Sequence, residues 1–351
     1  MRLLLGETWR HRIYAEPLLR RLRELGDVVF GFREEIYFRP RVELRPRMAN
    51  LSAASCRLQE KFQHGPRAER LNAAMLTAVG RVRPQAVIVF RGEQILPRTI
   101  RAIRETRALV AAYRNDDPSS LSRPAYVWRH FVASVPCFGH VFAYRQENCS
   151  DLADAGARQV SPLRSFYLRE EHPPIPGRAK DLDVSFVGHW EDDRRTEHVE
   201  AILGVPSIRF GLWGGNWHTS PLAEVLRERF GPLNVLEPPE YNRTTNRSKV
   251  CVGFLSAINN DTYTRRCFEI PAAGGFMLAP YTEDLAALFR ESQEAEYFRS
   301  SGEMLDKIRF YLDHDVVRER IAWAGCQRLL RDGHEALDRA RQMREEILRL
   351  L

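Results

Sequence analysis

The sequence predicts an α/β protein of two domains, each with a parallel sheet covered by helices on both faces, followed by a helical C-terminus. Short apolar runs alternate with amphipathic stretches in both halves of the chain, as in β-α-β units. At 351 residues the chain is long for one hydrophobic core. A charged segment with three prolines and one glycine, REEHPPIPGRAKDLD at 169–183, has the composition of a linker between the halves.

The domain boundaries follow from this linker. We expect an N-terminal domain over 1–168, the linker over 169–183, a second domain over 184–335, and a C-terminal helix over 336–351 that packs back towards the N-terminal domain. In open parallel sheets, ligands bind beyond the carboxyl ends of the strands. We therefore expect the loops at these ends in both domains to face one central cleft.

The first half opens with strands over 2–6 and 27–32 around an amphipathic helix over 15–25, which Gly26 ends. Residues 33–66 are rich in arginine, and no structure is predicted for them. The other elements predicted here are a helix over 71–82, a strand over 86–90, a helix over 97–104, strands over 109–113 and 141–144, a helix over 149–155 and a strand near Val160.

The second half repeats the alternation of strands and helices. A strand over 184–187 ends in Gly188, and the apolar segment 276–279 follows the glycine pair at 274–275. The other elements predicted here are strands over 207–212 and 250–255 and helices over 196–203, 305–312, 316–330 and 335–351.

The charge of the chain favours an anionic small molecule over nucleic acid as a partner. The net charge is +7, with a pI near 9.2. However, only four basic residues are lysines, and the 49 arginines are scattered along the whole chain rather than clustered in a stripe with aromatic residues. This bias resembles codon usage in a GC-rich genome. A peripheral contact between a basic face and a membrane stays open.

The cysteine pattern indicates a reducing compartment. The six cysteines are far apart and form no C-x-x-C pair, so the sequence predicts neither a zinc site nor a disulfide framework. The N-terminal apolar run is too short for a signal peptide, and there is no run of about 18 apolar residues. We expect a cytoplasmic protein.

The stretch from Asp261 to Pro280, DTYTRRCFEIPAAGGFMLAP, is the strongest candidate for a ligand site. A helix that begins between Tyr263 and Arg266 would direct its first amides, with the charges of Arg265 and Arg266, at a diphosphate. One turn later, Glu269 could accept hydrogen bonds from sugar hydroxyls. Alternatively, the arginines belong to a solvated helix face, and the glycine pair only ends a helix.

Asp116 and Asp117 follow a predicted strand and are candidates for a general base on an acceptor hydroxyl. Equally, Asn-Asp-Asp-Pro favours a turn and a helix N-cap without any catalytic role. Glu7 and His11, in the first loop, are alternative bases.

Two further glycine-containing loops are candidates for donor binding. Gly188, which Arg194 and Arg195 follow, permits close approach of a phosphate to the backbone. The run WGGNWH at 213–218 includes Trp213 and Gly214, which could pack a ring or a sugar face. Each loop could also be a structural turn.

Several chemistries are disfavoured because their motifs are absent from the sequence. There is no G-x-x-x-x-G-K-[ST], G-x-G-x-x-G, G-x-S-x-G or H-E-x-x-H motif, and no aspartate pair typical of a metal-dependent sugar transferase. The sequence therefore favours metal-free chemistry with no resident cofactor.

Residues 184–345 resemble the CgeB-type (spore maturation protein-like) glycosyltransferases. The resemblance rests on VSFVG at 184–188, TRRCFEIPAAGG at 264–275, EDLAALF at 283–289, EMLDKIRFYLDH at 303–314 and RERIAWAG at 318–325, with YRNDDP at 113–118 in the first half. These enzymes have the GT-B fold, in which two Rossmann-like domains face a cleft. The resemblance implies transfer of a hexose-like unit from a nucleotide-diphosphate sugar to a hydroxyl of a carbohydrate, protein or small molecule.

The resemblance also implies roles for individual residues. In related GT-B transferases an E-x7-E pair lies beside the donor, so Glu269 would bind the ribose and Asp261, here an aspartate, the sugar. Arg266 would bind the diphosphate, with Arg265 as second choice. The residues expected at the donor are Glu269, Arg266, Arg265, Asp261, Thr264, Gly188, Trp213 and Gly214, and those expected in catalysis are Asp117, Asp116 and His11.

Three functions remain open at this point. The transferase would stabilise a diphosphate leaving group with fixed positive charge and exclude water by domain closure, and either stereochemical outcome is compatible with the residues. A sugar-nucleotide epimerase of the same fold would change the donor alone. A GT-B-like binding protein would hold the donor without turnover.

Overall fold

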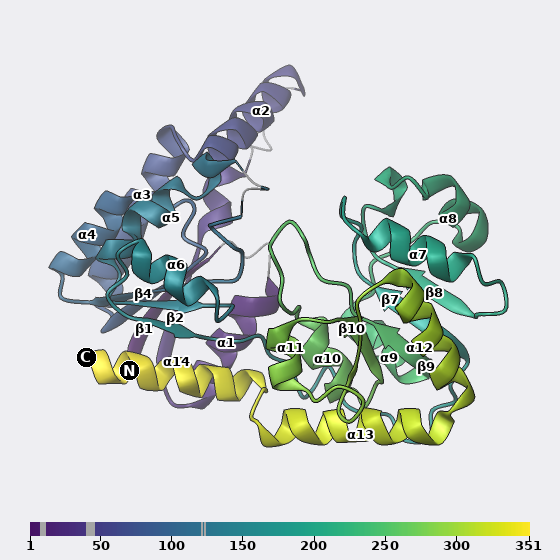
Figure 1. Ribbon diagram of the computed structural model, residues 1–351. Helices are drawn as coiled ribbons and strands as arrows, with labels where there is room; N and C mark the ends of the chain where they lie inside the picture. Colours follow the sequence, from purple (N-terminus) through teal and green to yellow (C-terminus); the bar gives the residue numbers. More distant parts are fainter. Residues whose placement is uncertain (8–11, 40–45, 121, 123) are drawn as a thin grey trace. The chain divides into compact units, whose positions relative to one another are not determined.

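The computed structural model describes residues 1–7, 12–39, 46–120, 122 and 124–351 and confirms the predicted α/β class. The chain forms two compact units (Figure 1). Unit 1 consists of residues 1–164 and 336–351, and unit 2 consists of residues 165–335. His11 lies outside the described residues, and the side chain of Glu7 is not described.

Unit 1 contains a six-stranded sheet in the order β2-β1-β3-β4-β5-β6, with every neighbouring pair parallel. Its strands are β1 (Arg2–Glu7), β2 (Val28–Arg33), β3 (Ala86–Phe90), β4 (Leu109–Arg114), β5 (His140–Ala143) and β6 (Val160–Pro162). Every residue of β3 is buried because helices cover both faces of the sheet, as its continuous apolar run predicts.

The helices of unit 1 lie on both sides of this sheet (Figure 1). They are α1 (Arg12–Glu24), α2 (Pro46–Phe62), α3 (Pro66–Val82), α4 (Pro97–Glu105), α5 (Arg129–Ser134), α6 (Asn148–Asp154) and α14 (Ala336–Leu350), with short 3-10 turns η2 (Glu34–Phe38), η3 (Ala125–Val127) and η4 (Val135–Cys137). Residues of α3 and α4 pack on one face in a shared core. The C-terminal helix α14 packs against α1 and is fixed by Arg344, whose Nε lies 3.0 Å from Asp27 Oδ2.

Unit 2 contains a five-stranded parallel sheet in the order β11-β10-β9-β7-β8. Its strands are β7 (Leu182–Val187), β8 (Phe210–Trp213), β9 (Ser248–Val252), β10 (Met277–Pro280) and β11 (Glu296–Phe298). Because all of them run in the same direction, the loops after β7, β8, β9 and β10 meet at one edge of the sheet.

The helices of unit 2 also cover both faces of their sheet. They are α7 (Arg195–Leu203), α8 (Ala223–Phe230), α9 (Pro238–Arg247), α10 (Arg266–Ala272), α11 (Glu283–Leu288), α12 (Ser301–Asp313) and α13 (Asp315–Arg331), with the 3-10 turn η5 (Trp217–Thr219). Helix α12 packs against α7 and β9, whereas α9 contacts β7 and β9 and α10 contacts α13. Ser300 caps α12 by accepting a hydrogen bond from the Glu303 amide.

The elements that the sequence predicted are present, with boundaries shifted by a few residues at most ends. Those that the sequence did not predict include α2, α8, α9 and β11. Helix α9 was missed because its inward face is polar: Asn242, Thr245 and Asn246 are buried there, and the side-chain amides donate to the carbonyl of Pro173 or of their own helix. Such a helix has no apolar periodicity to read.

The segment expected to be a linker, 169–183, is packed in unit 2. The backbone amide of Ile175 donates to Asn246 Oδ1 at 2.7 Å, and the carbonyl of Pro173 accepts from Asn242 Nδ2 at 3.0 Å. Its last residues, Leu182 and Asp183, already belong to β7. Helix α9 therefore holds this segment in place.

Two further features of the described chain concern its cysteines and its helices. All six cysteines have free thiols, and four of them are buried. None of the described helices is both long enough and apolar enough to span a membrane.

Candidate functional site

The candidate site lies at the carboxyl edge of the unit 2 sheet, where two glycines bring two loops together. Gly188 follows β7 and Gly214 follows β8, and the Gly188 amide donates to the Trp213 carbonyl at 2.8 Å. Gly214 has φ +138°, and a Cβ there would lie 2.0 Å from the Gly188 carbonyl oxygen. Only glycine permits this approach, so the sequence pattern reflects a real steric requirement.

Arg266, the first residue of α10, reaches this pair of loops. Its guanidinium carbon would lie 3.2 Å from a Cβ at position 188, and it sits 5.6 Å from the ring centroid of Phe186. Its Nε is buried and has no hydrogen-bond partner, and no carboxylate forms an ion pair with it in the described chain. Together with its place beside Gly188, this makes Arg266 a candidate for binding an anion.

Glu269 lies one turn further along α10 and is 8% exposed. Its Oε1 forms an ion pair with Arg265 and lies 3.5 Å from His172 Nε2. Burial alone would raise the pKa of Glu269, but the charges of Arg265, His172 and Arg266 outweigh it and lower the pKa. The carboxylate is therefore ionised.

The two neighbouring arginines have different surroundings. Arg265 pairs with Glu269 and lies 5.5 Å from the ring centroid of Phe166, so it holds the carboxylate in place. Arg266 points to Gly188 instead.

Asp261 and Thr264 shape the loop that leads into α10. The Asp261 carboxylate accepts from the Ser256 amide at 3.3 Å, which closes a tight turn after β9. The Thr264 carbonyl accepts from the Cys267 amide at 3.0 Å and begins the first turn of the helix. Helix α10 has only seven residues, so its dipole contributes less here than the charge of Arg266 does.

The loop after β7 contains a charge network centred on Arg195. This side chain is 2% exposed, and its guanidinium lies 3.2 Å from Glu191 Oε2 and 3.4 Å from Asp193 Oδ2. Burial by itself raises the pKa of Glu191, but the hydrogen bond from His189, the charge of Arg195 and the hydrogen bond from Ser256 together lower it to about 2. The network fixes the loop that carries Gly188.

Two cavities adjoin these loops. The smaller has a volume of 300 Å³ and lies between the start of α7 and the loops after β9, β10 and β11. Its walls include Asp193, Arg195 and Asp261. The charges of Arg266 and Asp261 both act on the pKa of Arg195, and Asp261 lines the cavity with it.

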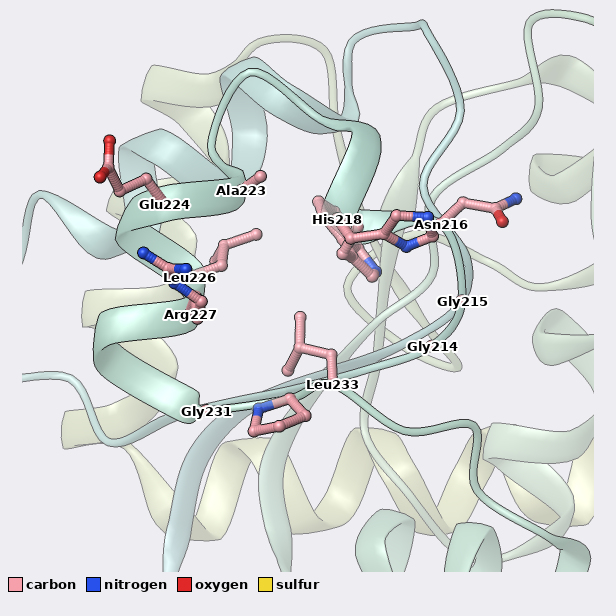
Figure 2. A pocket seen from close by; sticks show the side chains of 12 residues that line it. Gly214, Gly215, Asn216, His218, Ala223, Glu224, Leu226, Arg227, Gly231 and Leu233 are labelled. Atoms are coloured by element: carbon pink, nitrogen blue, oxygen red, sulfur yellow. The ribbon is translucent and has the colours of Figure 1, made fainter.

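The larger cavity has a volume of 770 Å³ and begins at Gly214. Figure 2 shows α8 as one wall, with Leu226 and Arg227, and Asn216 and His218 opposite. Trp217 also lines it and donates from Nε1 to the Gly188 carbonyl at 2.9 Å. Trp213, which the sequence favoured, is half-buried in β8 and lines neither cavity.

In unit 1, the candidate bases Asp116 and Asp117 follow β4 and are both buried. Asp116 Oδ2 lies 2.7 Å from Arg91 Nη2. Asp117 Oδ1 accepts from the Ser119 amide at 2.9 Å and from Asn148 Nδ2 at 3.1 Å. Asp117 therefore forms the turn that the alternative interpretation of this motif predicted.

Sequence reasoning missed several residues of these two edges. Glu191 and Asp193 lie in the loop from Gly188 to Arg195, and Trp217 lies in the WGGNWH run, but the sequence predicted no individual role for them. His172 has no motif of its own, and only the fold brings these residues to the site. Glu34, the first residue of η2, is 1% exposed, and its Oε1 has no hydrogen-bond partner. Burial, then the charges of Glu93 and Glu35, raise the pKa of Glu34 to about 8 against the opposing charge of Arg91.

Metal-binding side chains do not gather in this region. Among the residues that the structure describes, no group of three or more histidine, cysteine, aspartate or glutamate side chains is placed to hold a metal ion.

Comparison with known proteins defines the class of fold. Residues 194–345 match a protein family described as glycosyl transferase-like. No curated protein matches the sequence. Sucrose-phosphate synthase from Thermosynechococcus elongatus is 12% identical with a TM-score of 0.70, and the match covers 99% of this chain and 98% of that one.

Two further solved structures share the architecture. HepE from Anabaena, in complex with UDP and glucose, is 12% identical with a TM-score of 0.69, and 99% of each chain is covered. A putative UDP-N-acetylglucosamine 2-epimerase from Listeria monocytogenes is 10% identical with a TM-score of 0.58, covering 97% of this chain and 94% of that one. The predicted GT-B fold is confirmed, and the narrower resemblance to the CgeB type stays a prediction.

Proposed function

We propose that the protein transfers a glycosyl unit from a nucleotide-diphosphate sugar to a hydroxyl-bearing acceptor. The position of Arg266 carries this proposal, because its guanidinium adjoins Gly188 and its buried Nε has no protein acceptor. The glycosyl transferase-like family match over 194–345 and the UDP complexes of HepE agree with it. We expect the diphosphate to lie between Arg266 and the Gly188 backbone.

The remaining parts of the donor can be assigned around this diphosphate. We propose that the nucleobase enters the cavity that begins at Gly214, whose mixture of Leu226 and Leu233 with Asn216 and His218 suits a polar aromatic ring. Glu269 has a buried, ionised carboxylate one helical turn from Arg266, and we propose that it binds the ribose. Asp261 is proposed to contact the transferred sugar.

In this reaction, the leaving group is the part that most needs electrostatic stabilisation. The bond from the anomeric carbon to the diphosphate oxygen breaks, the acceptor oxygen bonds to that carbon, and its proton passes to a base. Negative charge grows on the diphosphate, so a fixed guanidinium beside it stabilises the transition state more than the ground state. Metal independence is proposed on the same ground, and chelation with EDTA tests it.

The base stays a proposal with two candidates, Asp116 and Asp117 in unit 1. Replacing either by asparagine keeps the hydrogen-bond acceptor of the turn and removes the proton-accepting carboxylate. The variant of the true base should lose about 100-fold or more in kcat without loss of stability. Full activity in both variants would exclude this pair.

A panel of nucleotide sugars tests the function. UDP-, GDP-, ADP- and dTDP-glucose are incubated with the protein and a mixture of alcohol, sugar and sugar-phosphate acceptors, and nucleotide diphosphate release and new glycosides are measured by mass spectrometry. We expect one nucleotide to bind and to be released only when an acceptor is present. Absence of binding by all four would contradict the proposal.

A sugar-nucleotide epimerase is the second candidate, because the Listeria protein of this architecture is described as one. It differs in its product: the isomerised donor would accumulate without any acceptor. Donor binding with neither product would instead favour a binding protein. A cytoplasmic location and a peripheral membrane contact remain predictions from the sequence.

A further inference from the structure

The smaller cavity of unit 2 has an aromatic floor and a polar wall. Phe254, Phe298 and His198 form the floor, and the His198 ring lies 5.1 Å from that of Phe254. Burial lowers the pKa of His198 to about 4, and its Nδ1 lies 2.8 Å from Ser301 Oγ, so this ring is neutral at pH 7. The floor therefore contributes apolar contact and no positive charge.

The wall beside α7 contains Asp193, whose side chain is 3% exposed. One carboxylate oxygen, Oδ1, accepts from the Arg195 amide at 3.0 Å. The other, Oδ2, lies 3.4 Å from Arg195 Nε in an ion pair but accepts no hydrogen bond. Burial raises the pKa of Asp193, and the charge of Glu191 adds to this rise. The charge of Arg195 and the hydrogen bonds from the backbone amides of Arg195 and Ala257 oppose the rise without cancelling it.

The arginines that line this cavity already form ion pairs with carboxylates of the protein. Arg195 lies between Glu191 and Asp193, which together carry one more negative charge than it neutralises. The two other arginines are directed to acidic residues outside the cavity lining, Arg194 to Glu197 and Arg299 to Glu291 and Glu303. Asp261 adds a further carboxylate to the wall.

Asp193 Oδ2 is a hydrogen-bond acceptor without a donor, and Asp193 lines a cavity of 300 Å³. A ligand with hydroxyl or amino groups could donate a hydrogen bond to it. This volume is at the lower end of the range for ligand pockets and suits one sugar ring better than a whole nucleotide. A ligand carboxylate would instead face Asp193 and Asp261. Two like charges repel in a partly buried site, because water screens them only weakly there.

We propose that this cavity binds the glycosyl unit of the donor and that Asp193 selects neutral or amino sugars and rejects acidic sugars. The inference rests on the proposed function and deepens it, since it names the class of sugar. Asp193 is then a specificity-determining residue that accepts a hydrogen bond from a sugar hydroxyl.

Isothermal titration with UDP, UDP-glucose and UDP-glucuronate tests the inference, because the two sugars differ only by the carboxylate at C6. We expect UDP-glucose to bind at least tenfold more tightly than UDP-glucuronate. Asp193→Asn keeps the shape and the acceptor at Oδ1 but removes the charge, so the ratio should fall to about threefold or less while the affinity for UDP stays unchanged. If the panel identifies GDP as the nucleotide, the three probes are GDP, GDP-mannose and GDP-mannuronate instead.

Asp192→Asn is the matched control, because Asp192 is the exposed neighbour and carries the same charge. It should leave the ratio at the wild-type value. Equal binding of both sugars by the wild type, or the same ratio in Asp193→Asn as in wild type, would overturn the inference. An equal fall of the ratio in Asp192→Asn would also overturn it, because the effect would then come from distant charge. Failure of the nucleotide itself to bind would contradict the proposed function.

Discussion

The polar loops at the carboxyl edges of the two sheets differ in how their charged side chains are paired. At the carboxyl edge of the unit 1 sheet, Asp116 pairs with Arg91 and Asp117 accepts from Ser119 and Asn148. At the same edge of the unit 2 sheet, Arg266 Nε and Asp193 Oδ2 are buried without hydrogen-bond partners. Asp116 Oδ2 and Asp193 Oδ2 are each held in an ion pair with an arginine, whereas Arg266 Nε has neither a hydrogen bond nor an ion pair among the described residues.

This difference shows that topology alone does not make a site. Both sheets are parallel and place strand-following loops at one edge. An unpaired buried polar group costs about 1–3 kcal/mol, so it persists where a ligand compensates for it or where function requires it. The aspartates after β4 are thus explained by the fold, and Arg266 is not.

The largest effect is expected where the unit 2 edge depends on close backbone contact. Gly214→Ala would place a Cβ 2.0 Å from the Gly188 carbonyl oxygen at φ +138°. We expect a loss of at least about 4 kcal/mol in the stability of unit 2, because backbone atoms on both sides must move. Hydrogen exchange of peptides from β7 and β8 measures it.

Gly80→Ala is the control for this substitution, since a Cβ at position 80 in α3 meets no atom within 4 Å. It should raise stability by about 0.5–1 kcal/mol. Wild-type protection of β7 and β8 in Gly214→Ala would show that the two loops are not held together as described.

Removal of the unpartnered cation should affect catalysis. Arg266→Ala is expected to lower kcat by about 100- to 1000-fold, the usual cost of removing one group that stabilises transition-state charge. Steady-state kinetics with the donor that the panel identifies measures this. Arg309→Ala, which removes an exposed arginine paired with Asp306, is the matched control and should retain wild-type activity.

At the unit 1 edge, Glu34 is buried and its Oε1 has no hydrogen-bond partner, so its pKa can be tested through stability. Its pKa is about 8 in the folded protein against 4.5 as an ordinary glutamate, so between these values the native state keeps a proton that the unfolded state releases. Wild-type stability should therefore fall as pH rises, by about 3 kcal/mol from pH 5 to pH 8 for this group alone.

Glu34→Gln removes this titration and should be more stable than wild type, by a margin that grows with pH. Urea denaturation at pH 5, 6, 7 and 8 measures the margin. The exposed Glu319→Gln provides the comparison, with no change in margin over the same range. A constant margin for Glu34→Gln would mean that Glu34 is ionised throughout.

The smallest effect concerns the ribose contact. Glu269→Ala should weaken nucleotide diphosphate binding by about 1–3 kcal/mol, the cost of losing a buried hydrogen-bond acceptor. Because the change also leaves Arg265 without its carboxylate, stability is measured in parallel, and Glu269→Gln separates charge from shape. Undiminished affinity in a folded Glu269→Ala protein would refute the assignment.

Much of the fold could be predicted from the sequence, because the spacing of apolar residues differs between strands and helices. The strand at 86–90 was predicted to the residue, since a buried parallel strand has a continuous apolar run. Helix α9 was missed because its buried face is made of asparagines and threonines that donate to backbone carbonyls. The same limit applies to the site: the sequence assigned no role to Asp193, whose role depends on the residues that it contacts.

The sequence by itself determined the β-α rhythm of both halves and the polar loops that follow their strands. It also determined the spacing that puts Arg266 and Glu269 on one helix. Only the tertiary structure decided that Arg265 pairs with Glu269, that Arg266 reaches Gly188 and that Asp193 and Asp261 line one cavity. The physical reason is range: periodicity follows from neighbouring residues, whereas the partner of a charge depends on which distant loops the packed core brings to one edge.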